Sequence, residues 1–447
     1  MTQDSTFPPA GAWHESSHAS LCLLGSYLHS RDFFQPWEAH IHPQQKALKY
    51  TPVQKLEMLF ISLLAGAKAV AHTNFTLRPD PALYRAFGLP GCAEQSVIAD
   101  TLDAMTEADL SSLREAIGDL FVQYSQARRH NFQQALLVLD VDLSPLPASR
   151  RAEGSERAYM GRSRSKTGRK LVRVQAVQYQ ETVWEEVRPG HTIESVTVLQ
   201  AVLEQAEQRL GLAGNSPDAQ AKRARTEIRL DSAWGSDRVI TWLLERGYHI
   251  TGKFKSTLRV RKLVAGITSW QPTSSPGRDV APLPTPLNFV RPLAQYAVRT
   301  PSAEKAGGYM YAVLFTSFVQ RTIQEVVADY DSRAGIEAEL KSDKRGLALA
   351  VLRKRRLVAQ TVVVLLAELA HNVLVWARGW LAKQVPRLGG YGIVRLVQEV
   401  GAVPGRVKLS GKQVQRVRLR RLHPLARDVV LGWRPLLAGG PPSLGLR

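Results

Sequence analysis

The chain has little cysteine and no long uninterrupted apolar run. Its 447 residues include two cysteines, Cys22 and Cys92. Two cysteines are too few for a disulfide framework and are typical of a protein in a reducing cytosol. The most apolar stretch, 361 to 377, is interrupted by a glutamate, a histidine and an asparagine, which predicts a buried helix rather than a membrane span. The N-terminus lacks a basic region followed by an apolar stretch, so no secretion signal is expected.

Acidic residues are scarce relative to basic ones. The chain has 39 Asp and Glu residues against 59 Lys and Arg residues, which gives a formal net charge of +20. Such a field attracts polyanions, and nucleic acid is the commonest of these, although an anionic membrane surface or simple solubility fits the same composition. We expect a DNA-binding protein without a membrane association, built from two or three domains at this length.

The first 130 residues divide into two parts. Residues 1 to 50 hold five histidines in irregular surroundings, without the paired Cys/His spacing of a metal site. From 51 to 130 the pattern is helical, and it opens with Thr51 and Pro52, a favourable pair for a helix start. We expect these helices to form a DNA-binding domain of helix-turn-helix character; a helical packing domain fits the pattern equally well.

After His130 the periodicity changes to that of a mixed α/β domain. Strands are predicted at 135–143, 170–179, 181–189, 226–230 and 248–252, and helices at 192–212 and 236–246. This order is that of the ribonuclease-H-like fold, which a further helix near Tyr330 should close. The predicted organisation is an irregular segment (1–50), a helical DNA-binding domain (51–130), a catalytic core (131–253 and 325–385), a β-rich insertion (254–324) and a basic C-terminal region (386–447).

Three acidic residues stand at the ends of the predicted core strands. Asp140 and Asp142 alternate with Val141, so their side chains share one face of the sheet. Burying two acids is costly unless they bind a cation or are paired; the alternative is a solvated edge turn. Asp231 directly follows the fourth strand and is expected beside the first strand, although a lone aspartate there can simply cap a helix.

A stripe of four residues completes the set of candidates. Tyr330, Arg333, Glu337 and Lys344 are three, four and seven residues apart, and this spacing places them on one face of a single helix. A carboxylate flanked by two cations suits phosphodiester chemistry, because the carboxylate can hold a metal ion and the cations can hold phosphate. The alternative is a solvated helix face.

These motifs give the chain a family resemblance. The spacing Y-x2-R-x3-E-x6-K is the YREK signature of DDE transposases of bacterial insertion sequences, and the chain resembles the branch named after insertion sequence 1380 over about residues 45 to 435. Other matching stretches are PALYRAFGL, LVLDVDLS, RLDSAWGSDRVITWLLERGY and RLHPLARDVV. The resemblance implies a catalytic, metal-binding triad of Asp231, Glu337 and one aspartate of LDVD. Asp142 fits the family pattern D-x-S better than Asp140, which stays as the alternative.

The resemblance also implies an activity. Such an enzyme cleaves DNA strands by metal-dependent hydrolysis and transfers them by transesterification, with two Mg²⁺ ions for which Mn²⁺ can substitute. It implies a homodimer on double-stranded DNA, at the transposon ends and the target, in the bacterial cytoplasm near the nucleoid. Two alternatives stay open: a catalytically inactive DNA-binding protein derived from a transposase, and a structure-specific DNA nuclease of the same fold.

Two basic segments are candidate DNA contacts. Nine Lys and Arg residues lie between 150 and 173, interleaved with glycine and serine, and predict a mobile loop that binds the duplex backbone or is merely solvated. The phosphate contacts expected there are Arg162, Arg164, Lys166 and Arg169, in addition to Tyr330, Arg333 and Lys344. Near the C-terminus, arginines at 416, 418 and 420 alternate with apolar residues, as in a half-buried strand whose basic face contacts either DNA or solvent.

Overall fold

The computed structural model has both mixed sheets and many helices, as a mixed α/β class requires. It describes residues 11–43, 45, 49–158, 166–255, 258–274, 276–302, 308–410, 413–438 and 440–447. The chain divides into two compact units. The sheet unit comprises 126–146 and 156–338, and the helical unit comprises 1–125, 147–155 and 339–447.

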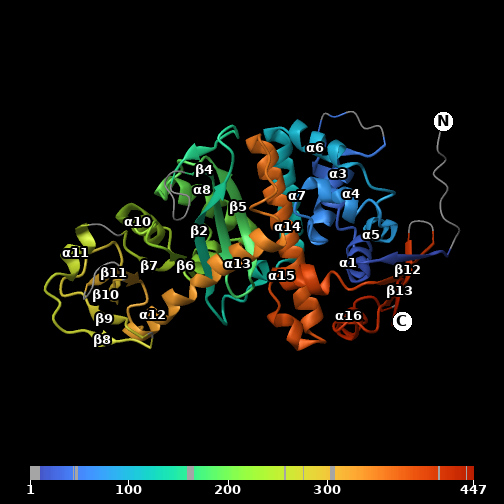
Figure 1. The fold of residues 1–447 in the computed structure, drawn as a ribbon. Helices are drawn as coiled ribbons and strands as arrows, with labels where there is room; N and C mark the ends of the chain where they lie inside the picture. Colours follow the sequence, from blue (N-terminus) through green and yellow to red (C-terminus); the bar gives the residue numbers. More distant parts are fainter. Residues whose placement is uncertain are drawn as a thin grey trace. The chain divides into compact units, whose positions relative to one another are not determined.

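Strands of the sheet unit lie at all five positions that the sequence predicts. They are β2 (Leu137–Pro147), β4 (Thr167–Ala176), β5 (Glu181–Arg188), β6 (Thr226–Leu230) and β7 (His249–Lys253). Their order in the sheet is β5-β4-β2-β6-β7. Figure 1 labels these strands, which are coloured green to yellow-green. β6 runs parallel to both β2 and β7, whereas β4 and β5 are antiparallel. A short strand, β3 (Glu156–Arg157), pairs with β4.

The segment after β7 extends the same sheet. It contains helix α11 (Leu258–Val264) and the strands β8 (Gln271–Pro272), β9 (Asp279–Pro282), β10 (Ala294–Pro301) and β11 (Tyr309–Thr316). β11 pairs antiparallel with β7, so that Thr316 lies opposite Thr251. The insertion is therefore β-rich, and it is continuous with the core sheet rather than a separate lobe.

Helices cover the sheet and fix its ends. They are α8 (Val196–Leu210), α9 (Pro217–Arg223), α10 (Asp237–Glu245) and α12 (Ile323–Ser332). α12 begins at a capping box, in which Thr322 and Glu325 satisfy each other's backbone N–H groups. Its apolar residues Val326 and Val327 pack on the buried valines and leucine of β9, β10 and β11, with Tyr330 beside them. This packing holds the C-terminal end of α12 on the sheet.

The single helix predicted from Tyr330 to Lys344 is broken, so that prediction is wrong. α12 ends at Ser332, and α13 begins at Ala334 and ends at Gly346. At the junction, the N–H of Arg333 donates to the carbonyl of Tyr330 at 3.1 Å, and the N–H of Ile336 donates to the carbonyl of Arg333 at 3.2 Å. Both bonds span three residues, the tighter pattern of a 3₁₀ turn. Tyr330, Arg333 and Glu337 nevertheless stay within electrostatic reach of one another across this turn.

The helical unit is built around α14 (Leu357–Ala382). This helix packs against α3 (Pro52–Leu64), α6 (Gln95–Ala104) and α7 (Glu107–Tyr124), and a helix surrounded on all sides can be apolar all round. Among the described residues, α14 is long and apolar enough to cross a membrane, but its most apolar window is wholly buried in the protein. The predicted buried helix at 361–377 is therefore confirmed. The shorter helices are α4 (Thr73–Thr76), α5 (Pro81–Ala86), α15 (Ile393–Arg395) and α16 (Ala426–Trp433).

The two ends of the chain meet in this unit. Residues predicted to be irregular form β1 (Trp13–Ser16), α1 (Ala19–His29) and α2 (Gln35–His40). β1 pairs antiparallel with β12 (Gly405–Ser410), which continues through β13 (Gln413–Leu419) to β14 (Ser443–Leu446). The segments predicted as separate domains at 1–50 and 386–447 therefore share one sheet, because a strand from each end supplies the other's backbone partners.

Candidate active site

Two aspartates lie side by side where β2 and β6 run in parallel. Val141 of β2 is in register with Leu230 of β6, and Asp142 and Asp231 each follow that pair by one residue. Paired positions on neighbouring strands share a face of the sheet, about 4.8 Å apart. The strand order thus brings together two acids that are far apart in the sequence.

Asp231 is fixed by a turn at the end of β6. Its Oδ1 accepts hydrogen bonds from the backbone N–H groups of Ala233, at 2.9 Å, and Trp234, at 3.3 Å. The turn then presses against the end of β7: the N–H of Lys255 donates to the carbonyl of Gly235 at 3.0 Å. A Cβ at Gly235 would lie 1.9 Å from the carbonyl oxygen of Lys253. Only glycine fits there, so this close approach determines where the Asp231 carboxylate lies.

Arg333 connects the strand acid to the helix acid. Its Nη2 donates to the carbonyl of Val141 at 3.1 Å and to Oδ1 of Asp142 at 3.2 Å, and its Nη1 lies 3.7 Å from Oε1 of Glu337. Arg333 is 4% exposed, whereas the Glu337 side chain is 68% exposed. The sequence predicts Arg333 as a phosphate contact on an open helix face. The structure instead buries its guanidinium, which contacts oxygens of β2 and of Glu337.

Three carboxylates gather here, and we call Asp142, Asp231 and Glu337 the acid cluster. Burial raises the pKa of Asp142, the Arg333 guanidinium opposes that rise, and the negative charges of Asp231 and Glu337 add to it. The two other acids therefore lie within electrostatic reach of Asp142. In the described part of the chain, no three Asp, Glu, His or Cys side chains stand in an arrangement that could hold a metal ion.

The alternative aspartate has a different environment. Asp140 lies opposite Arg229 across β2 and β6, and the two form a bidentate pair with Nε–Oδ1 of 2.7 Å and Nη2–Oδ2 of 2.9 Å. Both side chains are almost fully buried. Burial raises the pKa of Asp140, and the hydrogen bond from Arg229 opposes that rise. Both oxygens of Asp140 are thus engaged inside the sheet.

The same arginine ties α12 to the sheet. Nη1 of Arg229 donates to the carbonyl of Asp329 at 3.0 Å and to its Oδ1 at 3.2 Å. Asp329 also pairs with Arg321, whose Nη1 lies 2.9 Å from Oδ2. Charge-assisted bonds of this kind are the stronger hydrogen bonds of proteins. This network, together with Asp140, holds the end of α12 beside β6.

Tyr330 lies at the edge of the acid cluster. Burial raises its pKa to about 12; the positive charge of Arg333 opposes the rise, and the negative charges of Asp231 and Glu337 contribute to it. The phenol is therefore protonated at neutral pH and can donate a hydrogen bond. Its ring packs against the core that α12 shares with the insertion strands.

Two cations near the cluster were missed by sequence reasoning. Lys253 ends β7, and burial and the positive charge of Arg278 lower its pKa, while Asp231 and Asp331 raise it. Arg278, in the insertion, pairs with Asp331, with Nη1–Oδ2 of 2.5 Å. No motif spacing relates these residues, because β-sheet pairing alone brings the insertion beside β7.

The other predicted phosphate contacts differ in their exposure and location. Lys344 is partly buried on α13 and belongs to the helical unit. Lys166 is exposed just before β4, whereas Arg162 and Arg164 lie outside the described residues. Arg169 is fully buried within β4, so its prediction as a loop residue on DNA is wrong. Strand pairing of β4 with β2 and β5 places this charged side chain inside the fold.

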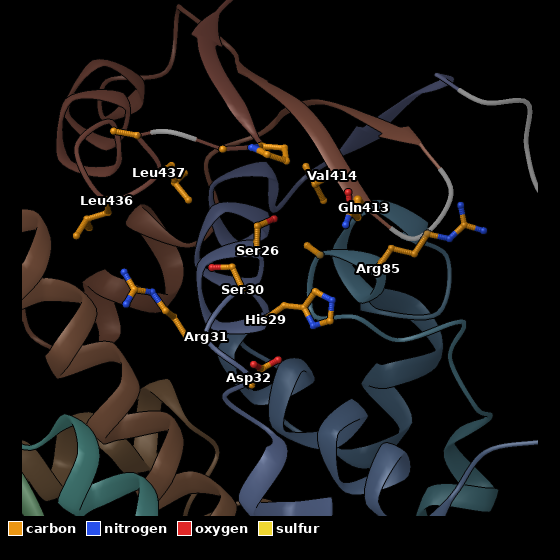
Figure 2. Close-up of a pocket in the computed structure, with 14 residues that line it drawn as sticks. Ser26, His29, Ser30, Arg31, Asp32, Arg85, Gln413, Val414, Leu436 and Leu437 are labelled. Carbon is orange, nitrogen blue, oxygen red and sulfur yellow. The ribbon is translucent and has the colours of Figure 1, made fainter.

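A separate cavity of about 540 Å³ lies in the helical unit. Figure 2 shows Ser26, Ser30 and Arg31 of the α1 end on one side and the strand that carries Val414 above them. Its lining includes a single acid, Asp32. The cavity therefore has no set of carboxylates comparable with the acid cluster.

No family model matches the chain, and no curated protein matches it. Among solved structures, it is similar to a piggyBac transposase, in a cryo-EM structure of the synaptic complex with hairpin DNA. The similarity has 12% sequence identity and a TM-score of 0.49, and it covers 86% of this chain and 79% of that chain. The side chains of the acid cluster are accordingly the basis on which a function can be assigned.

Proposed function

We propose that this chain is a DDE transposase of the YREK group, which cleaves DNA at the ends of an insertion sequence and transfers the cut strands to target DNA. The observation that supports this most strongly is the acid cluster. Its three carboxylates come from β2, from the turn after β6 and from α13, with the buried Arg333 among them. A buried acid whose pKa is raised, as that of Asp142 is, beside other charged side chains is typical of functional sites.

A ribonuclease-H-like core is part of this proposal. In that fold the first and fourth core strands are neighbours, and here β2 and β6 are paired in parallel. The order β5-β4-β2-β6-β7 places the first and fourth predicted strands side by side, as expected from the sequence. The insertion then occupies the chain between β7 and α12, the last helix before the YREK residues.

The proposed cofactor is Mg²⁺, as two ions, with Mn²⁺ as a substitute. Hard divalent cations prefer carboxylate oxygens, and the acid cluster offers only such oxygens. Burial raises the pKa of Asp142, and the negative charges of Asp231 and Glu337 add to that rise; a bound cation would offset both effects. Asp142, Asp231 and Glu337 would hold the ions. Their side chains do not stand in a metal-holding arrangement here, so binding would require the exposed Glu337 side chain to move toward the two aspartates; the ions would then activate the attacking oxygen and stabilise the leaving oxygen.

The surrounding side chains supply the remaining chemistry. Arg333 neutralises part of the negative charge of the cluster. Tyr330, which is protonated at neutral pH, can donate a hydrogen bond to a phosphate oxygen. Lys253 and Arg278 are cationic side chains beside the cluster. Lys344, the other phosphate contact expected from the sequence, belongs to the helical unit. Cations placed where charge develops lower the barrier of phosphoryl transfer.

The reaction proceeds in two displacements on DNA. Water first hydrolyses a phosphodiester bond at the end of the element, which frees a 3′-hydroxyl. That hydroxyl then attacks a second phosphodiester bond, so that one bond forms as another breaks. Two ends must be held together, and we propose a homodimer on double-stranded DNA in the bacterial cytoplasm, near the nucleoid.

A plasmid-nicking experiment tests this function. The substrate is a supercoiled plasmid that carries the gene of this chain with its flanking DNA, incubated with protein and Mg²⁺ or with EDTA. We expect Mg²⁺-dependent breaks at the two ends of the element, each with a 3′-hydroxyl that terminal transferase can label. Binding without cleavage would favour an inactive derivative, and cleavage of branched DNA regardless of sequence would favour a structure-specific nuclease.

A further inference from the structure

The C-terminal sheet of the helical unit carries a block of four cations. Lys408 of β12 is in register with Arg416 of β13, and Arg406 is in register with Arg418. The intervening residues Val407, Leu409, Val417 and Leu419 are buried. We call Arg406, Lys408, Arg416 and Arg418 the basic face. Its members lie about 5 Å apart across the strands and about 7 Å apart along them.

The opposite side of this sheet is covered by helices. α1 packs against β12 and β13, and α5 packs against both strands as well. Figure 2 shows the end of α1 beneath the strand that carries Gln413 and Val414. The basic face points away from these helices: the side chain of Arg406 is 54% exposed, and Arg416 and Arg418 are exposed as well.

Repulsion between the charges of the basic face destabilises the sheet. Like charges directly opposite each other on neighbouring strands are destabilising, and both registered pairs of the basic face consist of two cations. Among the described residues of β1, β12 and β13, one is acidic, Glu15 of β1. It contacts Arg406 and lies 2.8 Å from Arg447. At the sheet edge, the guanidinium of Arg418 lies 5.2 Å from the ring centre of Trp13. An external polyanion would relieve the repulsion.

We propose that the basic face docks the sugar-phosphate backbone of duplex DNA. A flat block of cations on neighbouring strands is suited to positioning a duplex rather than reading its sequence, because phosphate contacts carry no sequence information. Arginine guanidinium groups can hold phosphate oxygens in a bidentate manner. This inference rests on the proposed function in so far as DNA is the substrate, but it assigns a surface on the helical unit, separate from the acid cluster.

The test is the salt dependence of binding to a labelled 40-base-pair duplex of random sequence. The full chain is compared with a variant that combines Arg406→Ala, Lys408→Ala, Arg416→Ala and Arg418→Ala. Each lost phosphate contact reduces the slope of log K against log salt by about 0.9, so we expect the slope to flatten by about 2 to 4 units. Affinity at low salt should fall at least tenfold.

The matched control removes the same charge from the same unit, outside the basic face. Lys49, Lys383, Arg427 and Arg434 are all exposed, and their combined replacement by alanine should leave the slope within about one unit of the wild type, since they contact no phosphate. If the fourfold variant does not fold, by circular dichroism and thermal melting, Arg406→Gln with Arg418→Gln should flatten the slope by about 1 to 2 units. Replacing Arg406, Arg416 and Arg418 by lysine should leave the slope at its wild-type value.

An unchanged slope in the basic-face variant, or equal flattening in the control, would overturn the inference. The outcome is independent of catalysis. If the wild-type protein nicks plasmid with Mg²⁺ and the basic-face variant has an unchanged salt slope, only this inference is contradicted. If the basic-face variant has a flattened slope and the wild-type protein shows no Mg²⁺-dependent nicking, only the proposed function is contradicted.

Discussion

Nη2 of Arg333 lies 3.2 Å from Oδ1 of Asp142, and this contact joins the junction of α12 and α13 to strand β2. The arginine is buried, as is the aspartate, so each compensates the other's charge in a poorly hydrated place. The exposed side chain of Glu337 also contacts this guanidinium, at 3.7 Å. The position of the helix acid relative to the strand acids therefore depends on one side chain.

Removing that side chain should destabilise the sheet unit through Asp142. We expect Arg333→Ala to lower the free energy of unfolding by roughly 3 kcal/mol, because a buried carboxylate loses its counter-charge. Adding Asp142→Asn to this variant should restore about half or more of the loss. Urea denaturation of the wild type, both single variants and the double variant measures the coupling. Additive effects would mean that the contact contributes nothing to stability.

The two aspartates of β2 should differ in what they support. Asp140→Asn should destabilise β2 and β6 by roughly 3 kcal/mol, because the buried Arg229 loses a bidentate partner. Asp142→Asn should cost less, about 1 kcal/mol, because Arg333 keeps the Val141 carbonyl and Glu337 as partners, and burial and two neighbouring acids already disfavour the charge of Asp142. Hydrogen exchange of peptides that cover the two strands reports the difference. Equal protection in the two variants would contradict these separate roles.

The turn that holds Asp231 should tolerate no side chain at Gly235. The added Cβ of Gly235→Ala would collide with the Lys253 carbonyl, so the turn must move and nicking should fall at least tenfold. Gly335→Ala is the matched control on α13, since nothing lies within 4 Å of its Cβ, and it should stabilise the helix by about 0.5 to 1 kcal/mol. Rates measured on the plasmid substrate compare the two. Full activity in Gly235→Ala would show that the turn is not a constraint.

A buried acid in the helical unit predicts a dependence of stability on pH. Burial raises the pKa of Glu57 from 4.5 to about 8, with a smaller contribution from Glu38. A raised acid pKa penalises the folded state fully above about pH 8, and the penalty disappears as pH falls toward 4.5. Glu57→Gln should therefore stabilise the protein by up to roughly 4 kcal/mol at pH 9 and by little at pH 5, at 1.36 kcal/mol per pKa unit. Melting temperatures at both pH values measure this; equal shifts would contradict it.

The core strands and the pairing of Asp142 with Asp231 could be predicted from the sequence, because apolar runs mark strands and their order fixes their neighbours. The break at Arg333 could not, since the spacing of the signature fits an unbroken helix and the turn depends on contacts with β2. Arg169 was misread for a similar reason. Its glycine-rich, basic surroundings are typical of a loop, yet β4 pairs with β5 and matches charges across strands, as Arg173 does with Glu185 at 2.6 Å.

The N-terminal strand was missed because its partner lies almost 400 residues away in the sequence. Trp13 pairs with Lys408, and no local pattern in residues 1 to 50 indicates a strand. Likewise, Lys253 and Arg278 are brought beside the acid cluster by sheet pairing alone. Local propensity predicts elements, whereas long-range pairing determines which side chains meet.

Mg²⁺-dependent nicking by charge-neutral variants of the acid cluster tests the central claim most directly. Asp142→Asn, Asp231→Asn and Glu337→Gln should each reduce nicking of the plasmid at least a thousandfold, because each loses a metal-binding charge, while duplex affinity stays within a few fold of the wild type. Glu339→Gln, on the same helix α13, is the matched control and should nick at the wild-type rate. Full nicking activity in Glu337→Gln, with folding and DNA binding intact, would contradict the account.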